Sequence, residues 1–199
     1  MELILVRHGL PLRVEGGEGP ADPGLAPEGH VQAARLADLF AATPVDAIYT
    51  SPMRRAVETA APLADRLSLA PIARDGLAEF DRDLTYYVPL EELRGSGDPR
   101  WSELVAEWTS VESEEDRRRF RAVVVETVER VVAEHPSERV ALVCHGGVVN
   151  AYLSHVLGLE RALFFEPSYT SISRVLAARG GHRQLVSANE TPHLPFAFR

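Results

Sequence analysis

Two histidines stand in matched settings near opposite ends of this 199-residue chain. Arg7-His8-Gly9 follows the apolar run Leu3 to Val6, and Cys144-His145-Gly146 follows the apolar run Val140 to Val143. Both runs are typical of buried strands, and in an open α/β sheet ligands bind at the carboxyl ends of the strands. We therefore expect the two rings to meet in one pocket. A neutral imidazole there can attack phosphorus and hold the phosphoryl group covalently, so the pattern predicts phosphoryl transfer.

Three arginines supply donors that suit phosphate oxygens. Arg7 precedes His8, and its planar guanidinium can make two parallel hydrogen bonds to a phosphate. Arg54 and Arg55 fall in the first turn of a predicted helix, where a cation opposes the helix dipole unless an anion lies in front of the helix. Alternation along a strand points Arg7 and His8 to opposite sides, so the chain must bend after Val6 for both to reach the pocket. The alternative for each arginine is a solvated side chain.

Glu79 is the candidate proton donor. It follows a short predicted strand and lies between Ala78 and Phe80. Apolar surroundings raise the proton affinity of a carboxyl group, and a protonated carboxyl can protonate the leaving oxygen of a phosphate ester. The alternative is a solvated glutamate, which is the commoner state of this residue type. Glu79 therefore indicates general acid catalysis only in combination with the two histidines.

The elements that must position these side chains alternate between strands and helices. Apolar runs bounded by Gly and Pro predict strands over residues 2–7, 47–49, 71–73, 139–143, 171–178 and 184–188. Amphipathic spacing predicts helices over residues 27–42, 52–67, 113–135 and 147–156. Ser51 is expected to cap the second helix, with Pro52 in its first turn. This alternation indicates an α/β fold, a three-layer α/β/α sandwich around a mainly parallel sheet.

Residues 80–112 interrupt the alternation. Pro and Gly residues divide this segment into short pieces around two tryptophans. We interpret it as a helical insertion over the active site, within a single domain that spans residues 1–199. Its aromatic side chains either line the substrate cleft or pack the inserted helices together. These side chains are Tyr86, Tyr87, Trp101 and Trp108.

In order and spacing, these motifs resemble the histidine phosphatase superfamily, the phosphoglycerate-mutase-like clan with the RHG motif. The likeness spans nearly the whole chain. Its motifs are Arg7-His8-Gly9, Leu25 to Ala33, Ser51 to Ala60, Leu77-Ala78-Glu79, His145-Gly146-Gly147 and Asn189 to Leu194. The resemblance implies a metal-independent phosphatase that hydrolyses phosphomonoesters without a cofactor.

The same resemblance implies a role for each site residue. His8 would be the phosphorylated nucleophile, and Glu79 would protonate the leaving group and later activate water. Arg7, Arg55 and His145 would bind the phosphate, and His145 would also assist catalysis. Cationic side chains would then neutralise charge in place of a metal ion. The expected partner is a small phosphorylated substrate.

The chain departs from the family pattern in the loop that follows the first motif. Many members have a threonine or serine where this chain has Pro11, and they continue to an asparagine that is absent here. Arg13 could replace these contacts, and we expect Arg13, Arg54 and Tyr86 to contact the substrate. The asparagine-rich continuation and greater length of the bisphosphoglycerate-dependent mutases are also missing. Hydrolysis is therefore favoured over mutase activity.

Two other functions stay open at this point. One is phosphoglycerate mutase activity, in which the phosphohistidine outlives the exchange of substrates. The other is a non-catalytic module that binds a phosphorylated ligand, which would have no need to keep both a nucleophile and an acid. Cys144 is expected to be a core residue rather than a nucleophile. The spacing of His8, Glu79 and His145 does not suit a metal site.

Composition limits the partners. The net charge of −8 disfavours nucleic acid, which binds to broad basic surfaces. No apolar stretch approaches the ~20 residues that a membrane-spanning helix needs, and no signal peptide is recognisable. Cys144 is the single cysteine, which fits a cytoplasmic protein without disulfides. A homodimer is compatible with the sequence, which leaves the oligomeric state open.

Overall fold

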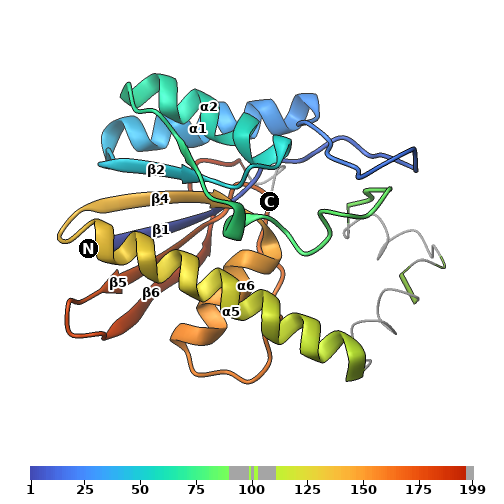
Figure 1. The fold of residues 1–199 in the computed structure, drawn as a ribbon. Coiled ribbons are helices and arrows are strands. Elements are labelled where there is room, and N and C mark those ends of the chain that lie inside the picture. Colours follow the sequence, from blue (N-terminus) through green and yellow to red (C-terminus); the bar gives the residue numbers. More distant parts are fainter. Residues whose placement is uncertain (90–98, 100, 103–110, 196–199) are drawn as a thin grey trace.

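A mixed sheet of six strands forms the centre of the computed structural model, which describes residues 1–89, 99, 101–102 and 111–195 (Figure 1). The strands are β1 (Glu2–Arg7), β2 (Ala47–Thr50), β3 (Ile72–Ala73), β4 (Arg139–Cys144), β5 (Ile172–Ala177) and β6 (Arg183–Glu190). Their order across the sheet is β3-β2-β4-β1-β5-β6. The first four in this order are parallel, β5 pairs antiparallel to β1, and β6 pairs antiparallel to β5. The expected mainly parallel sheet is confirmed.

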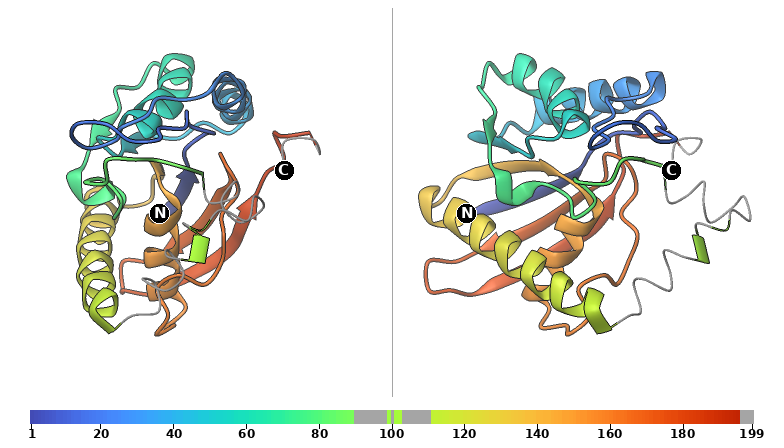
Figure 2. Two further views of the ribbon diagram at one scale, coloured as in Figure 1. Left: turned by 90° about the vertical axis from the view of Figure 1, so that its right-hand side faces the viewer. Right: turned by 45° about the vertical axis from the view of Figure 1, so that its right-hand side comes forward.

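Helices cover both faces of the sheet (Figures 1 and 2). The helices are α1 (Pro27–Ala42), α2 (Arg54–Leu67), α5 (Val111–Glu134) and α6 (Gly146–Val156), with a short 3₁₀ turn, η1 (Asp75–Leu77). Alternating residues of β1 belong to two separate hydrophobic cores. Leu3 and Leu5 pack with α5 and α6, whereas Ile4 and Val6 pack with α1 and α2. The three-layer α/β/α sandwich is therefore confirmed.

Helix α2 begins later than the sequence pattern predicts. Its N-cap is Met53, so the prediction that Ser51 caps the helix with Pro52 in its first turn is wrong. The Ser51 hydroxyl does accept a hydrogen bond from the Met53 N–H, at 3.2 Å, but this contact lies ahead of the helix. The displaced start leaves Ser51 in the turn between β2 and α2, where its hydroxyl meets a histidine described below.

The described part of the expected insertion is less helical than predicted. Residues 80–89 form turns and an extended stretch, residues 99 and 101–102 are helical, and α5 begins at Val111. Val14 and Tyr87 exchange two backbone hydrogen bonds of 2.8 Å, which tie residues 80–89 to the loop after β1. These backbone bonds replace the helical bonds that were expected. Trp108 and most of residues 90–110 lie outside the described residues, so the extent of the insertion stays a prediction.

Within the described residues, none of the helices combines the length and the apolar character that crossing a membrane demands.

Candidate active site

The rings of His8 and His145 lie together at the carboxyl edge of the sheet. Strands β1 and β4 are parallel neighbours whose last residues, Arg7 and Cys144, are paired in register. The His8 N–H continues this ladder by donating to the Cys144 carbonyl at 2.9 Å. The two imidazole centroids are 5.1 Å apart. Adjacent parallel strands thus deliver two side chains that are far apart in the sequence to one point.

His8 has the protonation state of a nucleophile. Its Nδ1 lies 2.8 Å from the Gly9 carbonyl oxygen. A carbonyl only accepts, so Nδ1 carries the proton and Nε2 keeps its lone pair. Burial, together with the charges of Arg55 and Arg7, lowers the pKa of His8 well below its ordinary value. The ring is therefore neutral at pH 7 and can attack through Nε2.

His145 is arranged as a hydrogen-bond donor. Its Nε2 lies 2.8 Å from the Ser51 hydroxyl. Ser51 is fully buried, and among the described residues Nε2 is the acceptor within reach of its hydroxyl hydrogen, so we assign that hydrogen to Nε2, which leaves the imidazole proton on Nδ1. Nδ1 is buried and has no hydrogen-bond partner among the described residues. Burial and the charges of Arg55, His8 and Arg7 lower the pKa of His145 well below its ordinary value, so the ring is neutral.

Arg7 and His8 reach the same site in spite of their alternation along the chain. The Arg7 guanidinium lies 3.9 Å above the Tyr169 ring and donates a hydrogen bond to the Pro167 carbonyl. The His8 ring is 5.8 Å from the same tyrosine. Strand β1 ends at Arg7, and the backbone of His8 donates to β4 and accepts from Thr170. Arg7 and His8 therefore both lie against Tyr169, although the backbone of His8 still pairs with β4.

Arg55 brings a nearly inaccessible positive charge to this group. Its side chain is 1% exposed, and it lies on the buried side of the first turn of α2. Its Nη2 donates to Asp81 at 2.9 Å, and its guanidinium carbon lies 4.6 Å from the Tyr87 ring centre. Its Nε and Nη1 are buried without a partner among the described residues. Buried cationic donors are costly unless an acceptor meets them, so these atoms suit an anion.

Glu79 is buried and is held by backbone donors. One carboxylate oxygen accepts from the Gly147 N–H at 2.7 Å, and the other accepts from the Phe80 N–H at 3.1 Å. Burial, reinforced by the negative charge of Asp81, raises the pKa of Glu79 to about 7. A carboxyl group with this pKa can give a proton and take it back near neutral pH.

Gly147 leaves the space that Glu79 occupies. A Cβ at this position would lie 2.2 Å from a Glu79 carboxylate oxygen. We therefore expect Gly147→Ala to displace Glu79, to lower the free energy of unfolding by about 1–3 kcal/mol, and to lower phosphatase activity. Thermal unfolding and p-nitrophenyl phosphate hydrolysis measure the two effects. Gly180→Ala is the control because its Cβ would meet nothing within 4 Å; equal effects of the two variants would contradict this prediction.

The residues expected to contact substrate are less closely tied to the site. Arg13 is exposed and pairs with Glu15 in the loop after β1. Arg54 is 63% exposed and donates to Glu58 at 2.7 Å. Among the described residues, the tyrosine that lies against Arg55 is Tyr87 rather than Tyr86. A role of Arg13, Arg54 or Tyr86 in substrate binding therefore stays a prediction.

Several contacts of the site have weak signals or none in the sequence. Ser51 follows β2, so the strand-end argument that found His8 also applies to it. Thr59 accepts from the Gly9 N–H at 2.9 Å and donates to the Arg55 carbonyl at 2.7 Å, which ties β1 to α2. Asp81 and Tyr169 lie in irregular segments, where no periodicity indicates which way a side chain points.

Cys144 is a core residue, as expected. Its side chain is fully buried in the cluster beneath α5 and α6, and burial raises the pKa of its thiol. A thiolate is therefore disfavoured at this position. No group of three or more histidine, cysteine, aspartate or glutamate side chains among the described residues is arranged to hold a metal ion.

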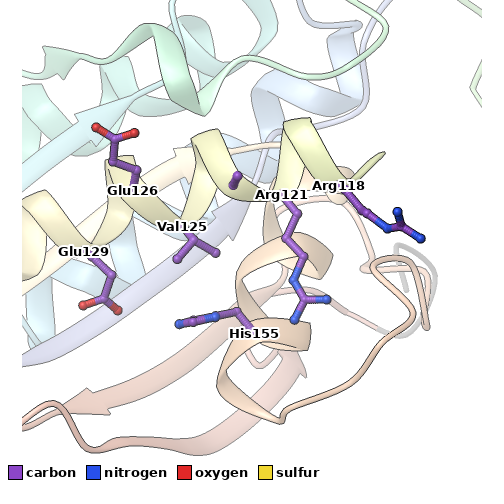
Figure 3. Close-up of a pocket in the computed structure, with 7 residues that line it drawn as sticks. Arg118, Arg121, Val125, Glu126, Glu129 and His155 are labelled. Carbon is purple, nitrogen blue, oxygen red and sulfur yellow. The ribbon is translucent and has the colours of Figure 1, made fainter. Parts of the chain in front are cut away.

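A hollow of about 560 Å³ lies on the outer side of α5 and α6 (Figure 3). The residues that line it are Arg118, Arg121, Ala122, Val125, Glu126, Glu129 and His155. None of them belongs to the group around His8. Arg118 pairs with Glu114 at 2.6 Å, and Arg121 donates to the Leu159 carbonyl at 2.8 Å, beyond the end of α6. These arginines make contacts within α5 and between α5 and the segment after α6. We therefore assign the hollow no role in the chemistry.

This fold and this group of side chains are typical of enzymes that transfer a phosphoryl group through a histidine. The chain belongs to the histidine phosphatase superfamily (branch 1), whose family model matches residues 3–191. The family expected from the RHG motif is confirmed.

Three similar proteins have names that describe them as phosphatases. A Hydrogenobacter thermophilus protein with the provisional name phosphoserine phosphatase 2 is 31% identical over 171 residues, 79% of each chain. The solved phosphoserine phosphatase mutant of Entamoeba histolytica with phosphoserine has a TM-score of 0.73 and 23% identity, covering 98% of this chain and 99% of its own. A mycobacterial glucosyl-3-phosphoglycerate phosphatase with VO3 has a TM-score of 0.72 and 22% identity, covering 96% and 99%. A histidine-phosphatase-type phosphomonoesterase is confirmed, and a mutase is not favoured.

Proposed function

We propose that this chain hydrolyses small phosphomonoesters through a phosphohistidine on His8, with no metal ion. One observation carries this proposal: the neutral His8 ring lies 5.1 Å from His145, in a group with three buried donors that have no hydrogen-bond partner within the described part of the chain. These donors are Nε and Nη1 of Arg55 and Nδ1 of His145. A phosphate group would accept hydrogen bonds from all of them, and Arg7 would add a further positive charge.

In the first step, the His8 Nε2 lone pair attacks phosphorus in line with the ester oxygen. The new N–P bond forms while the bond from phosphorus to the ester oxygen breaks. Glu79 gives its proton to that oxygen, so an alcohol leaves and Glu79 becomes a carboxylate. Arg7, Arg55 and His145 stabilise the negative charge on the remaining phosphoryl oxygens.

In the second step, water attacks the phosphohistidine. The Glu79 carboxylate takes a proton from this water as the new O–P bond forms. The N–P bond breaks, and its electron pair returns to Nε2 of His8, which is neutral again. Inorganic phosphate then leaves the donors of Arg55 and His145, and Glu79 has regained the proton for the next cycle.

Phosphoserine is the first substrate to test. The relatives named phosphoserine phosphatases motivate this choice, and one structural neighbour holds phosphoserine. The cytoplasmic location and the possible homodimer stay predictions beside it.

The purified enzyme is expected to release inorganic phosphate from phosphoserine or another small phosphomonoester, with or without a chelator. The experiment compares the amount of inorganic phosphate released with the amount of phosphoryl group transferred to a second alcohol such as glycerate. Transfer that exceeds release would favour a mutase. Thermal stabilisation by inorganic phosphate without turnover of any ester would instead favour a binding module.

A further inference from the structure

We propose that Asp81 is a positioning residue that keeps the catalytic proton on Glu79. This inference rests on the proposed function, because it concerns the acid of that reaction. Asp81 follows Glu79 by two residues in the turn after η1. It is absent from the motifs by which the sequence resembles its family.

Asp81 is held by Arg55. Burial raises the pKa of Asp81, and the charge and hydrogen bond of Arg55 oppose that rise. Its Oδ1 accepts from Arg55 Nη2 at 2.9 Å, with the arginine 1% and the aspartate 20% exposed. A charge-assisted hydrogen bond of this kind favours the ionised form of the carboxyl group. Tyr87 lies on the face of the same guanidinium, so the arginine is held both in its plane and from above. Asp81 therefore has a fixed cation beside it.

Among the described residues, no cationic side chain is hydrogen-bonded to Glu79. Its two oxygens accept hydrogen bonds from the backbone N–H groups of Gly147 and Phe80. The charge of Asp81 opposes ionisation of Glu79, so a proton bound by this pair goes to the member with weaker stabilisation of its charge. That member is Glu79.

The charges that face the pair come from several elements. From α2, Arg55 favours ionisation of both carboxyl groups, whereas Asp22, in the loop after β1, opposes ionisation of Asp81. From β4, the buried thiol of Cys144 stays neutral. The negative charge of Asp81 raises the pKa of Glu79, and the positive charge of Arg55 lowers it, so the two charges oppose each other at Glu79. Removing only the Asp81 charge would leave the arginine uncompensated, and Glu79 would lose its proton at a lower pH.

Asp81→Asn tests this directly, because asparagine keeps an oxygen that can accept from Arg55 and loses only the charge. The measurement is the pH dependence of kcat/KM for an alkyl phosphate, whose leaving oxygen needs the proton. In the wild type the alkaline limb follows Glu79. We expect the limb to move to lower pH by about one unit or more in the variant, and Asp81→Glu, which restores the charge, to move it back.

Asp75→Asn is the matched control. Asp75 lies in the same segment and also pairs with an arginine, Arg82, at 3.0 Å, but its side chain is 78% exposed. Removal of the Asp75 charge is expected to leave the alkaline limb of the pH profile at the wild-type pH. Thermal unfolding verifies that each variant is folded. If Asp81→Asn is not folded, Asp81→Ser, which also removes the charge, takes its place: a limb at lower pH then supports the proposal, and a limb at the wild-type pH contradicts it.

An unmoved alkaline limb in a folded Asp81→Asn enzyme would overturn the proposal. So would a uniform loss of activity at every pH, which a purely structural ion pair predicts. Neither result touches the proposed function, which is tested separately by the turnover of phosphomonoesters by the wild type and by His8→Ala.

Discussion

His8→Ala is expected to lower the turnover of p-nitrophenyl phosphate about 10³-fold or more, because the reaction loses its nucleophile. Nε2 of His8 keeps a lone pair, since Nδ1 donates to the Gly9 carbonyl, whereas the lone pair on Nε2 of His145 accepts from the Ser51 hydroxyl. The wild type, mixed with substrate and quenched in alkali, is expected to gain the mass of one phosphoryl group. The variant is expected to gain none.

Two further variants separate a nucleophile from a phosphate contact. His145→Ala keeps His8 intact, so it is expected to form the phosphoenzyme more slowly but still on the same residue. His182→Ala is the control for loss of a histidine, because His182 is exposed in the hairpin between β5 and β6. Near wild-type turnover by His8→Ala would show that the phosphohistidine mechanism is wrong.

The parts of this site that the sequence predicts are those that regular structure positions. His8 and His145 follow strands whose apolar runs are unmistakable, and parallel pairing of β1 with β4 then brings both rings together. Arg55 lies one residue inside α2, on its buried side. The period of the helix fixes the direction of Arg55, and the paired ends of the two strands fix where the two histidines lie. The same reasoning explains why the order of strands and helices could be predicted almost entirely.

Side chains on irregular segments could not be placed in this way. Asp81 and Tyr87 reach Arg55 from a stretch of turns, and Tyr169 reaches Arg7 from the connection before β5. Their positions depend on tertiary contacts such as the backbone pair between Val14 and Tyr87. No local pattern encodes contacts of this kind. The wrong cap at Ser51 has the same cause, because the hydroxyl that local rules assign to a helix is used by His145.

Glu79→Gln is expected to separate the two chemical steps. Glutamine keeps one of the two acceptor contacts to the backbone but can neither give nor take the catalytic proton. An alkyl phosphate such as phosphoserine needs that proton on its leaving oxygen, so its turnover is expected to fall by about 10²–10⁴-fold. Nitrophenolate leaves without a proton, so p-nitrophenyl phosphate is still expected to phosphorylate His8. Hydrolysis of the phosphoenzyme then stalls for lack of a base. Rapid mixing should show a burst of about one equivalent of nitrophenol.

The role of Glu79 as an acid also predicts in which direction activity changes with pH. With its pKa raised to about 7, Glu79 is protonated below that pH and is a carboxylate above it. The free enzyme needs the protonated form, so kcat/KM for an alkyl phosphate should fall above pH 7, by about tenfold per unit. Glu79→Gln should lack this limb, whereas Glu126→Gln, an exposed partner of Arg130, should keep it. An equal decrease in the turnover of both substrates by Glu79→Gln, without a burst, would contradict a proton-transfer role. Loss of a general acid slows the reaction of an alkyl phosphate more than that of p-nitrophenyl phosphate. An equal loss would therefore indicate that Glu79 supports the binding of phosphate instead.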